Sequence, residues 1–350
     1  MGVLNSFGFN RCHSDHSVFV KRSKVGVIIL IVYVDDIIVS GSDVDGIEEV
    51  KTKLKRKFQI KDLGKLRYFL GIEVARGIKG LILSQRKYVH DLLSEIDMLG
   101  SKPCDTPMDS NLKLDSSGSE EFKDKRRFRS LVGKLIYLTI TRPDITFVVG
   151  VVSQFMENPK QIHWDAISRV LKYLKGTIGM GVLYKKGSNW DIISYSDADW
   201  AGSKSDRRST SGYCTFVGGN LVTWRSKKQN VVVRSSAEVE YRAMAHTACE
   251  LMWIKNLMIE LGFQVKKPMV MFCDNQAATY IASNPMFHEH TKHIEVDCHF
   301  IREVVLKGEV VTPYVRSENQ LSDVFTKAVS RNLFVRFCSK LGMTNIYAPA

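Results

Sequence analysis

The part of the chain after Trp190 contains the pattern that most restricts the fold. Three short β-type stretches come first, at Ile192–Ser196, Gly212–Val217 and Leu221–Arg225. They lead into a long helical pattern from about Ala237 to Leu261, which Gly262 ends. Strand and helix patterns then alternate: a strand at Met269–Cys273, helices at Asn275–Ala282 and Val296–Leu306, a strand at Val310–Val315 and a helix from about Leu321. We therefore predict a mixed α/β (α+β) sheet with helices on its faces.

The front of the chain is dominated by the apolar run Val25–Val34, which ends in Asp35 and Asp36. A bilayer-spanning helix needs about 20 apolar residues, so this run is better interpreted as a buried strand. Val18–Val20 precedes it across a polar turn, which predicts a hairpin with the two acids at a sheet edge. A helix is predicted over Ser42–Phe58.

The middle of the chain separates these two parts. Short strands around Tyr68–Val74 and Leu81–Leu83 precede a helix at about Gln85–Met98. Cys104–Glu121 is rich in turn residues and is the best linker candidate. Lys123–Gly176 is then largely helical in pattern.

Charge and cysteine content limit the partner and the compartment. The 50 basic and 37 acidic residues give a net charge of +13, which fits a polyanionic partner but also fits a chain that is merely kept in solution. The seven cysteines are scattered, with no Cys-x-x-Cys pair, and no signal peptide opens the chain. We expect a soluble intracellular protein, of cytoplasm or nucleus, without a membrane partner.

Four acids of the last part stand at element ends: Asp197, Glu240, Asp274 and Asp323. If they converge without lysine partners, they repel one another and raise their own pKa values. Divalent cations remove that penalty, and oxygen ligands with open positions suit Mg²⁺ or Mn²⁺. Two such ions would support phosphodiester hydrolysis. Solvated caps are the common alternative for acids at such places.

Longer motifs surround these acids in order. They are Tyr195–Gly202 (YSDADWAG), Arg208–Gly212 (RSTSG), Ser235–Ala243 (SSAEVEYRA), Cys273–Ala277 (CDNQA), His290–Ile294 (HTKHI) and Gln320–Lys327 (QLSDVFTK). Together they closely resemble the RNase H domain of copia-type retroelements. The resemblance implies a two-metal site that cuts the RNA strand of RNA–DNA hybrids.

Position by position, the resemblance makes Asp197, Glu240, Asp274 and Asp323 the catalytic metal ligands. Asp199 is the runner-up for the first ligand, and Glu238 competes less well with Glu240. Ser235, Ser236 and Gln276 stand where relatives touch the hybrid, whose RNA strand is recognised by its 2′-hydroxyls. Tyr314–Asn319 contains no histidine, so no general-acid histidine is assigned.

A second resemblance covers the front. The run Ile28–Gly41 with its Tyr-Val-Asp-Asp centre, and Phe58–Gly64 and Tyr68–Val74 after it, are similar to the palm of a copia-type reverse transcriptase. This implies that Asp35 and Asp36 are catalytic metal ligands. The family's further aspartate lies on an upstream strand that the residues before Asp35 do not resemble. We therefore expect an incomplete site and no polymerase activity from this chain alone.

The segment Leu131–Asp144 resembles the connection between these two domains. The predicted domains are a reverse transcriptase part with palm and thumb (1–110), a linker and connection (111–189), an RNase H-like domain (190–330) and a C-terminal tail (331–350). The rest of a retroelement polyprotein is a possible partner. Three interpretations stay open: a hybrid-cutting nuclease, a binding-only remnant, and a fossil copy without function. Integrase is disfavoured because its acids run Asp, Asp, Glu.

Two further groups have structural interpretations. The histidines near position 290, with Cys298, match no standard zinc spacing and are interpreted as a polar face; they are His288, His290, His293 and His299. Trp200, Trp224 and Trp253 have core-like neighbours and are interpreted as packing residues.

Overall fold

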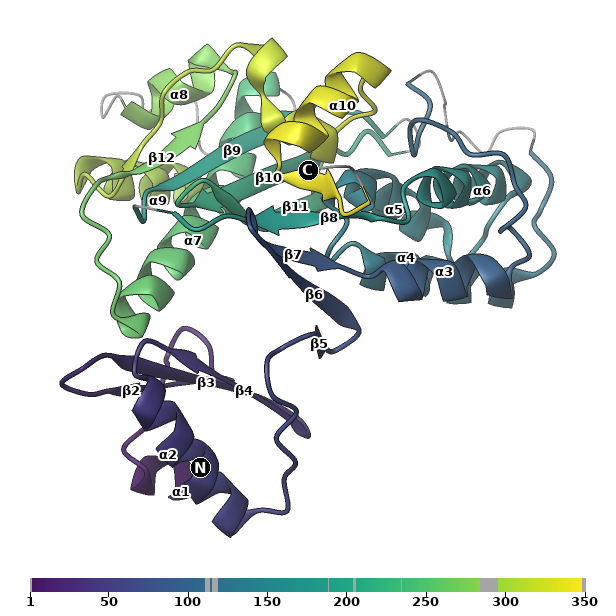
Figure 1. The fold of residues 1–350 in the computed structure, drawn as a ribbon. Helices are drawn as coiled ribbons and strands as arrows, with labels where there is room; N and C mark the ends of the chain where they lie inside the picture. Colours follow the sequence, from purple (N-terminus) through teal and green to yellow (C-terminus); the bar gives the residue numbers. More distant parts are fainter. Residues whose placement is uncertain are drawn as a thin grey trace. The chain divides into compact units, whose positions relative to one another are not determined.

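The computed structural model describes residues 2–110, 114, 119–187, 189–203, 206–233, 235–283 and 295–347. The chain divides into two compact units. The first is Met1–Leu70 with Cys249–Lys266, and the second is Gly71–Ala248 with Lys267–Ala350. Helices and strands carry the labels of Figure 1.

The first unit contains a four-stranded antiparallel sheet in the order β1-β2-β3-β4. Its elements are α1 Gly2–Ser6, β1 Asn10–Arg11, β2 Val18–Arg22, β3 Val27–Tyr33, β4 Asp36–Gly41, α2 Val44–Lys57 and β5 Tyr68–Phe69. Strands β2 and β3 form the predicted hairpin, and α2 is the helix predicted after it. Ile28 on β3 is fully buried and packs in one cluster with Val50 and Leu54 of α2.

The C-terminal half of the long helix α7 (Ser236–Leu261) belongs to the first unit. The Glu260 carboxylate accepts hydrogen bonds from the backbone N–H groups of His13 and Ser14, each at 3.1 Å. The Trp253 indole donates to the Ser14 carbonyl oxygen at 2.8 Å. These contacts fix the helix end against the segment that precedes β2.

The second unit contains a helical layer beside a small antiparallel sheet. The strands pair in the order β14-β8-β7-β6. Its elements are β6 Ile72–Gly77, β7 Gly80–Ser84, α3 Arg86–Glu95, α4 Lys125–Leu138, η1 Pro143–Ile145, α5 Thr146–Val152, η2 Ser153–Phe155, α6 Gln161–Gly176, β8 Met180–Tyr184 and β14 Met343–Asn345. The helices match the predicted helical region, whereas β8 and β14 were not predicted.

The main sheet of the second unit has the order β11-β10-β9-β12-β13. Its strands are β9 Ile192–Asp199, β10 Thr210–Val217, β11 Asn220–Lys228, β12 Met269–Phe272 and β13 Val310–Val311. Strands β9, β10 and β11 are antiparallel, and β12 and β13 add in parallel. The helices α8 Gln276–Ser283 and α9 Glu295–Leu306 follow β12. The mixed sheet that the sequence predicts is therefore observed.

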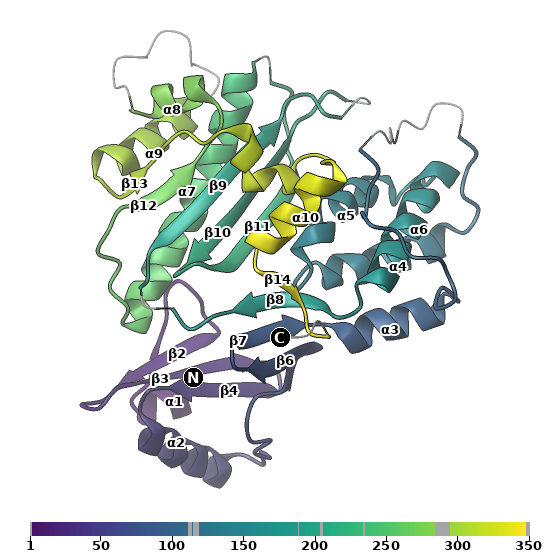
Figure 2. The same ribbon diagram turned by 45° about the horizontal axis from the view of Figure 1, so that its top comes forward.

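The end of the chain differs from the sequence prediction. Strand β13 ends at Val311, and beyond Pro313, which has no N–H to donate, the pairing continues only as an isolated bridge between Tyr314 and Cys273. Leu321 begins a short 3₁₀ helix, η5 (Leu321–Phe325), and the α-helix α10 begins only at Arg331 and ends at Lys340. The predicted helix from Leu321 was therefore wrong in type. Figures 1 and 2 show this C-terminal segment, in yellow, lying across β9 and β10.

The core of the second unit includes a buried ion pair. The Arg142 guanidinium is 1% exposed and donates to both carboxylate oxygens of Asp144, at 3.0 Å from Nε and 2.7 Å from Nη2. The Tyr173 hydroxyl also donates to Asp144, at 2.5 Å, and Arg142 donates to the Thr177 carbonyl at 3.0 Å. These bonds tie the start of α5 to the end of α6.

Candidate metal centre

Two neighbouring parallel strands place the first two acids. Asp197 lies on β9, and Asp274 follows β12. Because Phe272 lies opposite Tyr195 in the parallel pair, both acids stand two residues beyond the same register position. Asp197 is 2% exposed, so its carboxylate is buried at the sheet rather than at a solvated end. The sheet therefore sets the spacing of this pair.

Asp323 can lie close to Asp197 and Asp274 because the neighbouring strand β10 has a glycine, Gly212, at the point of contact. Gly212 on β10 lies opposite Asp197. A Cβ at this position would lie 2.7 Å from both Phe325 Cβ and Thr326 Cγ2. The absence of a side chain thus lets η5 lie close against the sheet, which buries Asp323 to 6% exposure.

The four predicted acids come together in two overlapping groups. Carboxylate oxygens of Asp197, Asp274 and Asp323 lie within 4.8 Å of one another. Ligand atoms of Glu240, on α7, Cys273 and Asp274 form a second such group. Asp274 belongs to both, so all four predicted acids form one cluster. Their service as metal ligands stays a prediction.

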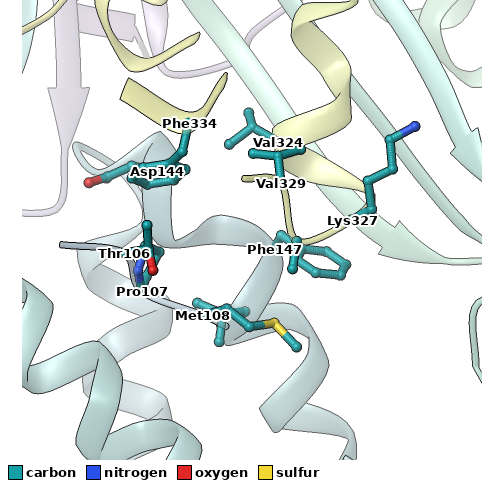
Figure 3. A pocket seen from close by; sticks show the side chains of 11 residues that line it. Thr106, Pro107, Met108, Asp144, Phe147, Val324, Lys327, Val329 and Phe334 are labelled. Carbon is teal, nitrogen blue, oxygen red and sulfur yellow. The ribbon is translucent and has the colours of Figure 1, made fainter. Parts of the chain in front are cut away.

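A lysine that the sequence analysis did not identify lies among the acids. Lys327 Nζ is 2.9 Å from Asp323 Oδ1 and 3.8 Å from Asp197 Oδ2. Lys327 follows Asp323 by four residues, and the turn after η5 directs its side chain back to the cluster. Its stem borders a pocket of about 290 Å³ that also contacts Val324 and Phe334. In Figure 3 the ammonium points away from that pocket.

Two hydroxyl groups that the sequence did not reveal hold the carboxylates. The Thr326 hydroxyl donates to Asp197 Oδ2, and the Ser317 hydroxyl donates to Asp274 Oδ2 at 2.7 Å. The buried Gln320 amide donates to the Ser196 carbonyl at 2.9 Å, which ties the η5 segment to β9. Thr326 and Gln320 lie inside the motif at 320–327, which was the only signal for them.

The electrostatics of the cluster follow from burial. Loss of water raises the pKa of Asp323 to about 7, and the negative charge of Asp197 adds to this rise while Lys327 opposes it. Burial, with Asp197 and Asp274 nearby, also holds the pKa of Glu240 well above its usual range. The pKa of Asp197 rises mainly by burial, against the opposing charge of Lys327. One ammonium therefore compensates the acids only in part.

The alternative acids lie outside the cluster. Asp199 is half-buried at the end of β9, and burial raises its pKa, but it belongs to neither group of close carboxylates. Glu238 forms an ion pair with Arg242 at 3.5 Å. The geometry therefore favours Asp197 over Asp199 and Glu240 over Glu238.

The predicted nucleic-acid contacts are exposed. Ser235 and Ser236 lie at the start of α7, where the Ser235 hydroxyl accepts a hydrogen bond from the Glu238 N–H at 3.2 Å. Gln276 is exposed at the first residue of α8. Their contact with a hybrid stays a prediction.

The palm acids stand apart in the first unit. Asp35 lies in the tight turn between β3 and β4, Asp36 begins β4, and both are exposed. Val34 in the same turn has a φ of 49°, a strained conformation for a β-branched residue. Among the described residues no third metal-ligating side chain joins the two acids in a close group.

The tryptophans only partly agree with their prediction as packing residues. Trp200 is 52% exposed although its indole donates to the Val233 carbonyl at 3.2 Å, and Trp253 is 38% exposed. For these two the prediction was wrong: Trp200 directly follows the end of β9, and Trp253 lies on an exposed side of α7. Trp224 is half-buried and packs against the core. Of the histidines interpreted as a polar face, His299 is exposed on α9. His288, His290 and His293 lie outside the described residues, as does the Cys298 side chain.

Comparison with known proteins identifies the family. Residues 1–110 match the family of reverse transcriptases (RNA-dependent DNA polymerases). The retrovirus-related Pol polyprotein from transposon RE1 of Arabidopsis thaliana is 44% identical over 343 residues, which are 98% of this chain and 23% of the relative. A putative transposon Ty5-1 protein of Saccharomyces cerevisiae is 34% identical over 252 residues, 71% of this chain and 82% of the relative. The chain belongs to the copia-type retrotransposon Pol family.

A third relative also matches nearly the whole of this Pol chain. The Pol polyprotein from transposon TNT 1-94 of Nicotiana tabacum is 37% identical over 348 residues, 97% of this chain and 26% of the relative. The chain thus spans about a quarter of the length of the Pol polyproteins it matches. The predicted family, the C-terminal region of a copia-type Pol polyprotein, is confirmed.

A solved structure shows the fold. The foamy viral protease-reverse transcriptase in complex with an RNA/DNA hybrid matches 86% of this Pol chain and 37% of its own, with a TM-score of 0.50 and 13% identity. The Pol chain therefore combines a reverse transcriptase fragment with an RNase H-like fold, as predicted. Among the described residues, no helix is long and apolar enough to cross a membrane.

Proposed function

We propose that this chain is a ribonuclease H that cuts the RNA strand of RNA–DNA hybrids by two-metal phosphodiester hydrolysis. The observation that carries the proposal is the convergence of Asp197, Asp274 and Asp323 within 4.8 Å, with Glu240 joined to them beside Asp274. The RNase H-like fold agrees with it. The foamy viral enzyme of similar fold is described with an RNA/DNA hybrid, which supports the same substrate here.

The chemistry of the cluster fits divalent cations. The four acids offer hard carboxylate oxygens, which Mg²⁺ and Mn²⁺ prefer. Burial raises the pKa values of Asp197, Glu240 and Asp323, neighbouring carboxylates add to the rise, and Lys327 opposes it without cancelling it. Cations at the cluster would favour the ionised acids, so the donor set fits two Mg²⁺ ions, with Mn²⁺ as a substitute.

The residues of the chain would then position the reaction. Bound Mg²⁺ would supply Lewis acidity and a water of lowered pKa. Asp197 and Asp274 are held by paired strands, and the Thr326 and Ser317 hydroxyls fix the orientation of their carboxylates. Such fixed ligands lower the reorganisation that the transition state requires.

Substrate contacts belong to the exposed helix starts. Ser235 and Ser236 at α7, and Gln276 at α8, would donate to or accept from the backbone of the hybrid. An RNA strand differs from DNA by its 2′-hydroxyls, which such short polar side chains can recognise. The specificity for RNA would therefore come from groups near the acids rather than from the acids themselves.

The reverse transcriptase part is proposed to be inactive alone. Asp35 and Asp36 would be two ligands of a polymerase metal site that needs a further aspartate. The first unit groups no other metal-ligating side chain with them among the described residues. Nucleotide incorporation by the purified chain, without other subunits, is the result that contradicts this part.

We assign domains as a reverse transcriptase part (1–110), a connection (111–189), the RNase H domain (190–330) and a C-terminal segment (331–350). We also infer an intracellular setting. The chain spans only part of its relatives, so we infer the rest of the Pol polyprotein as a partner.

The decisive experiment is cleavage of a labelled RNA–DNA hybrid. The parent is assayed with Mg²⁺ and with EDTA, beside Asp274→Asn and the matched control Asp191→Asn. Asp191 forms an ion pair with Lys267 and takes no part in the acid cluster. Cutting of only the RNA strand, lost with EDTA and in Asp274→Asn but kept in Asp191→Asn, supports the proposal.

A binding protein that cuts nothing is the second candidate. The ammonium of Lys327 favours it, because a positive charge 2.9 Å from Asp323 opposes cation binding. Tight binding of the hybrid with no cleavage under Mg²⁺ or Mn²⁺ would select this candidate.

A further inference from the structure

A basic groove lies apart from the acid cluster in the second unit. It measures about 470 Å³ and is lined by residues of β10, β11 and α7: Ser211, Tyr213, Arg225, Lys227, Lys228, Gln229, Asn230 and His246. Strand β11 is the edge strand of the main sheet, beside β10, as Figure 2 shows. Three of the lining residues are lysine or arginine, and none is acidic.

The groove and the Asp197 side chain lie on opposite faces of the main sheet, because side chains alternate between the two faces along a strand. Gly212 lies opposite Asp197 and faces η5. Its neighbours Ser211 and Tyr213 therefore point to the opposite face. Register pairs them with Lys227 and Arg225 on β11, whose side chains share that face. A strand of nucleic acid in the groove would not occupy the acid cluster.

Two cations of the groove are uncompensated. Arg225 and Lys227 are exposed, and neither has an ion pair among the residues that the structure describes. Lys228 is different, because it pairs with Asp206 at 2.9 Å and points to the other face. The charge of Asp297 acts on His246, but Asp297 already pairs with Arg242 at 3.6 Å. The groove therefore keeps a net positive charge.

The floor of the groove is held by a buried glutamine. Gln229 is 8% exposed, and its amide nitrogen donates to the Ser211 hydroxyl at 2.8 Å and to the Val239 carbonyl at 3.1 Å. These two hydrogen bonds join β10 to the start of α7, so the floor of the groove is fixed.

From these features we infer that the groove binds one strand of nucleic acid, with phosphates at Arg225 and Lys227. The two cations are two residues apart on one face of an extended strand, so they lie about 7 Å apart and can each take a phosphate. This site goes beyond the proposed nuclease, because it requires neither metal nor cutting.

The test measures binding in EDTA, where no cutting occurs. A fluorescent single-stranded RNA of 12 uridines is titrated with the whole chain and with Arg225→Glu/Lys227→Glu. The matched control is Lys185→Glu/Lys186→Glu, which makes the same charge change at two exposed lysines outside the groove. We expect the groove variant to bind the RNA at least about tenfold more weakly. The slope of its log affinity against log salt concentration should also be shallower, by the equivalent of about one phosphate contact or more. The control should bind about as the parent does.

Other outcomes overturn the inference. An unchanged affinity of the groove variant, or an equal loss in the control, would mean that only net charge matters. Displacement of the RNA by polyglutamate as well as by unlabelled RNA would indicate a site for an acidic protein. If the charge reversal unfolds the chain, as circular dichroism would show, Arg225→Gln/Lys227→Gln decides by the same criteria. Failure of hybrid cleavage has no bearing on this result.

Discussion

Lys327 Nζ lies 2.9 Å from Asp323 Oδ1, inside the group of acids that the sequence suggests as metal ligands. The ammonium is held by its stem, which borders the pocket of Figure 3 beside Val324. It is also 3.8 Å from Asp197. A fixed cation at this point stabilises the ionised acids when no metal is present, and it competes with a metal that uses the same oxygens.

Replacement of Lys327 by methionine is therefore expected to change metal affinity and stability in opposite directions. Without the competing charge, Mn²⁺ should bind roughly three- to tenfold more tightly, as measured by isothermal titration calorimetry. In EDTA the same variant should unfold at lower urea concentration than the parent.

The control for Lys327→Met is Lys267→Met, which removes one lysine that is 71% exposed and far less constrained. This control variant should keep the Mn²⁺ affinity of the parent and unfold at the same urea concentration in EDTA. Weaker Mn²⁺ binding by Lys327→Met would show instead that the lysine orients Asp323 for the metal.

The raised pKa of Asp323, about 7, predicts a pH dependence of stability without metal. The unfolded carboxyl has a pKa of about 3.9, so the folded state binds the proton more tightly. This contribution to stability is present below about pH 4 and is lost as the pH rises through about 7. The metal-free parent should lose stability relative to Asp323→Asn between pH 5 and pH 8, by on the order of 1 kcal/mol or more.

Urea unfolding of both proteins in EDTA at the two pH values measures that difference. Asp191→Asn serves as the matched control, because its carboxyl is outside the acid cluster. A constant difference between the parent and Asp323→Asn would contradict the predicted titration. Added Mg²⁺ should weaken the trend, since a bound cation favours the ionised acid.

Much of this arrangement could be predicted from sequence because strand and helix periodicity is local. The hairpin of β2 and β3 and the long helix α7 agree with their apolar patterns. The quartet of acids followed from the motif resemblance, and the structure brings all four together. Spacing alone could not have chosen them, because Asp199 stands on the same strand as Asp197.

What the sequence did not reveal depends on tertiary geometry. Lys327 joins the cluster because it follows Asp323 by four residues, and nothing in the sequence pattern marked it as a partner of the acids. Strand β8 pairs with β14, far away in sequence, and neither has a strong pattern of its own. Close approach at Gly212 is likewise visible only once η5 is placed.

The buried pair Arg142–Asp144 predicts a large loss of stability when one partner is removed. Asp144→Ala leaves a guanidinium that is 1% exposed without its carboxylate, and it also strips the Tyr173 hydroxyl of its acceptor. We expect a loss of about 3 to 5 kcal/mol in the free energy of unfolding. Chemical denaturation measures it.

The matched control for Asp144→Ala is Asp109→Ala, because Asp109 forms a half-exposed ion pair with Arg169 at 3.7 Å. Exposed pairs contribute at most about 1 kcal/mol, so this variant should be nearly neutral. Equal losses in the two variants would contradict the assignment of Arg142–Asp144 as a buried structural pair.

Gly212→Ala tests whether the close approach of η5 builds the acid cluster. The added methyl would lie 2.7 Å from Phe325 Cβ and from Thr326 Cγ2, so η5 must move away from β10. That shift carries Asp323 and the Thr326 hydroxyl away from Asp197. We expect Mn²⁺ affinity to fall by at least about tenfold, with a loss of about 1 to 3 kcal/mol in the free energy of unfolding.

The control is Gly133→Ala in the middle of α4, where nothing lies within 4 Å of the new methyl. It should stabilise the chain by about 0.5 to 1 kcal/mol and leave metal binding unchanged. Normal Mn²⁺ binding by Gly212→Ala would mean that Asp323 does not depend on this contact for its place among the acids.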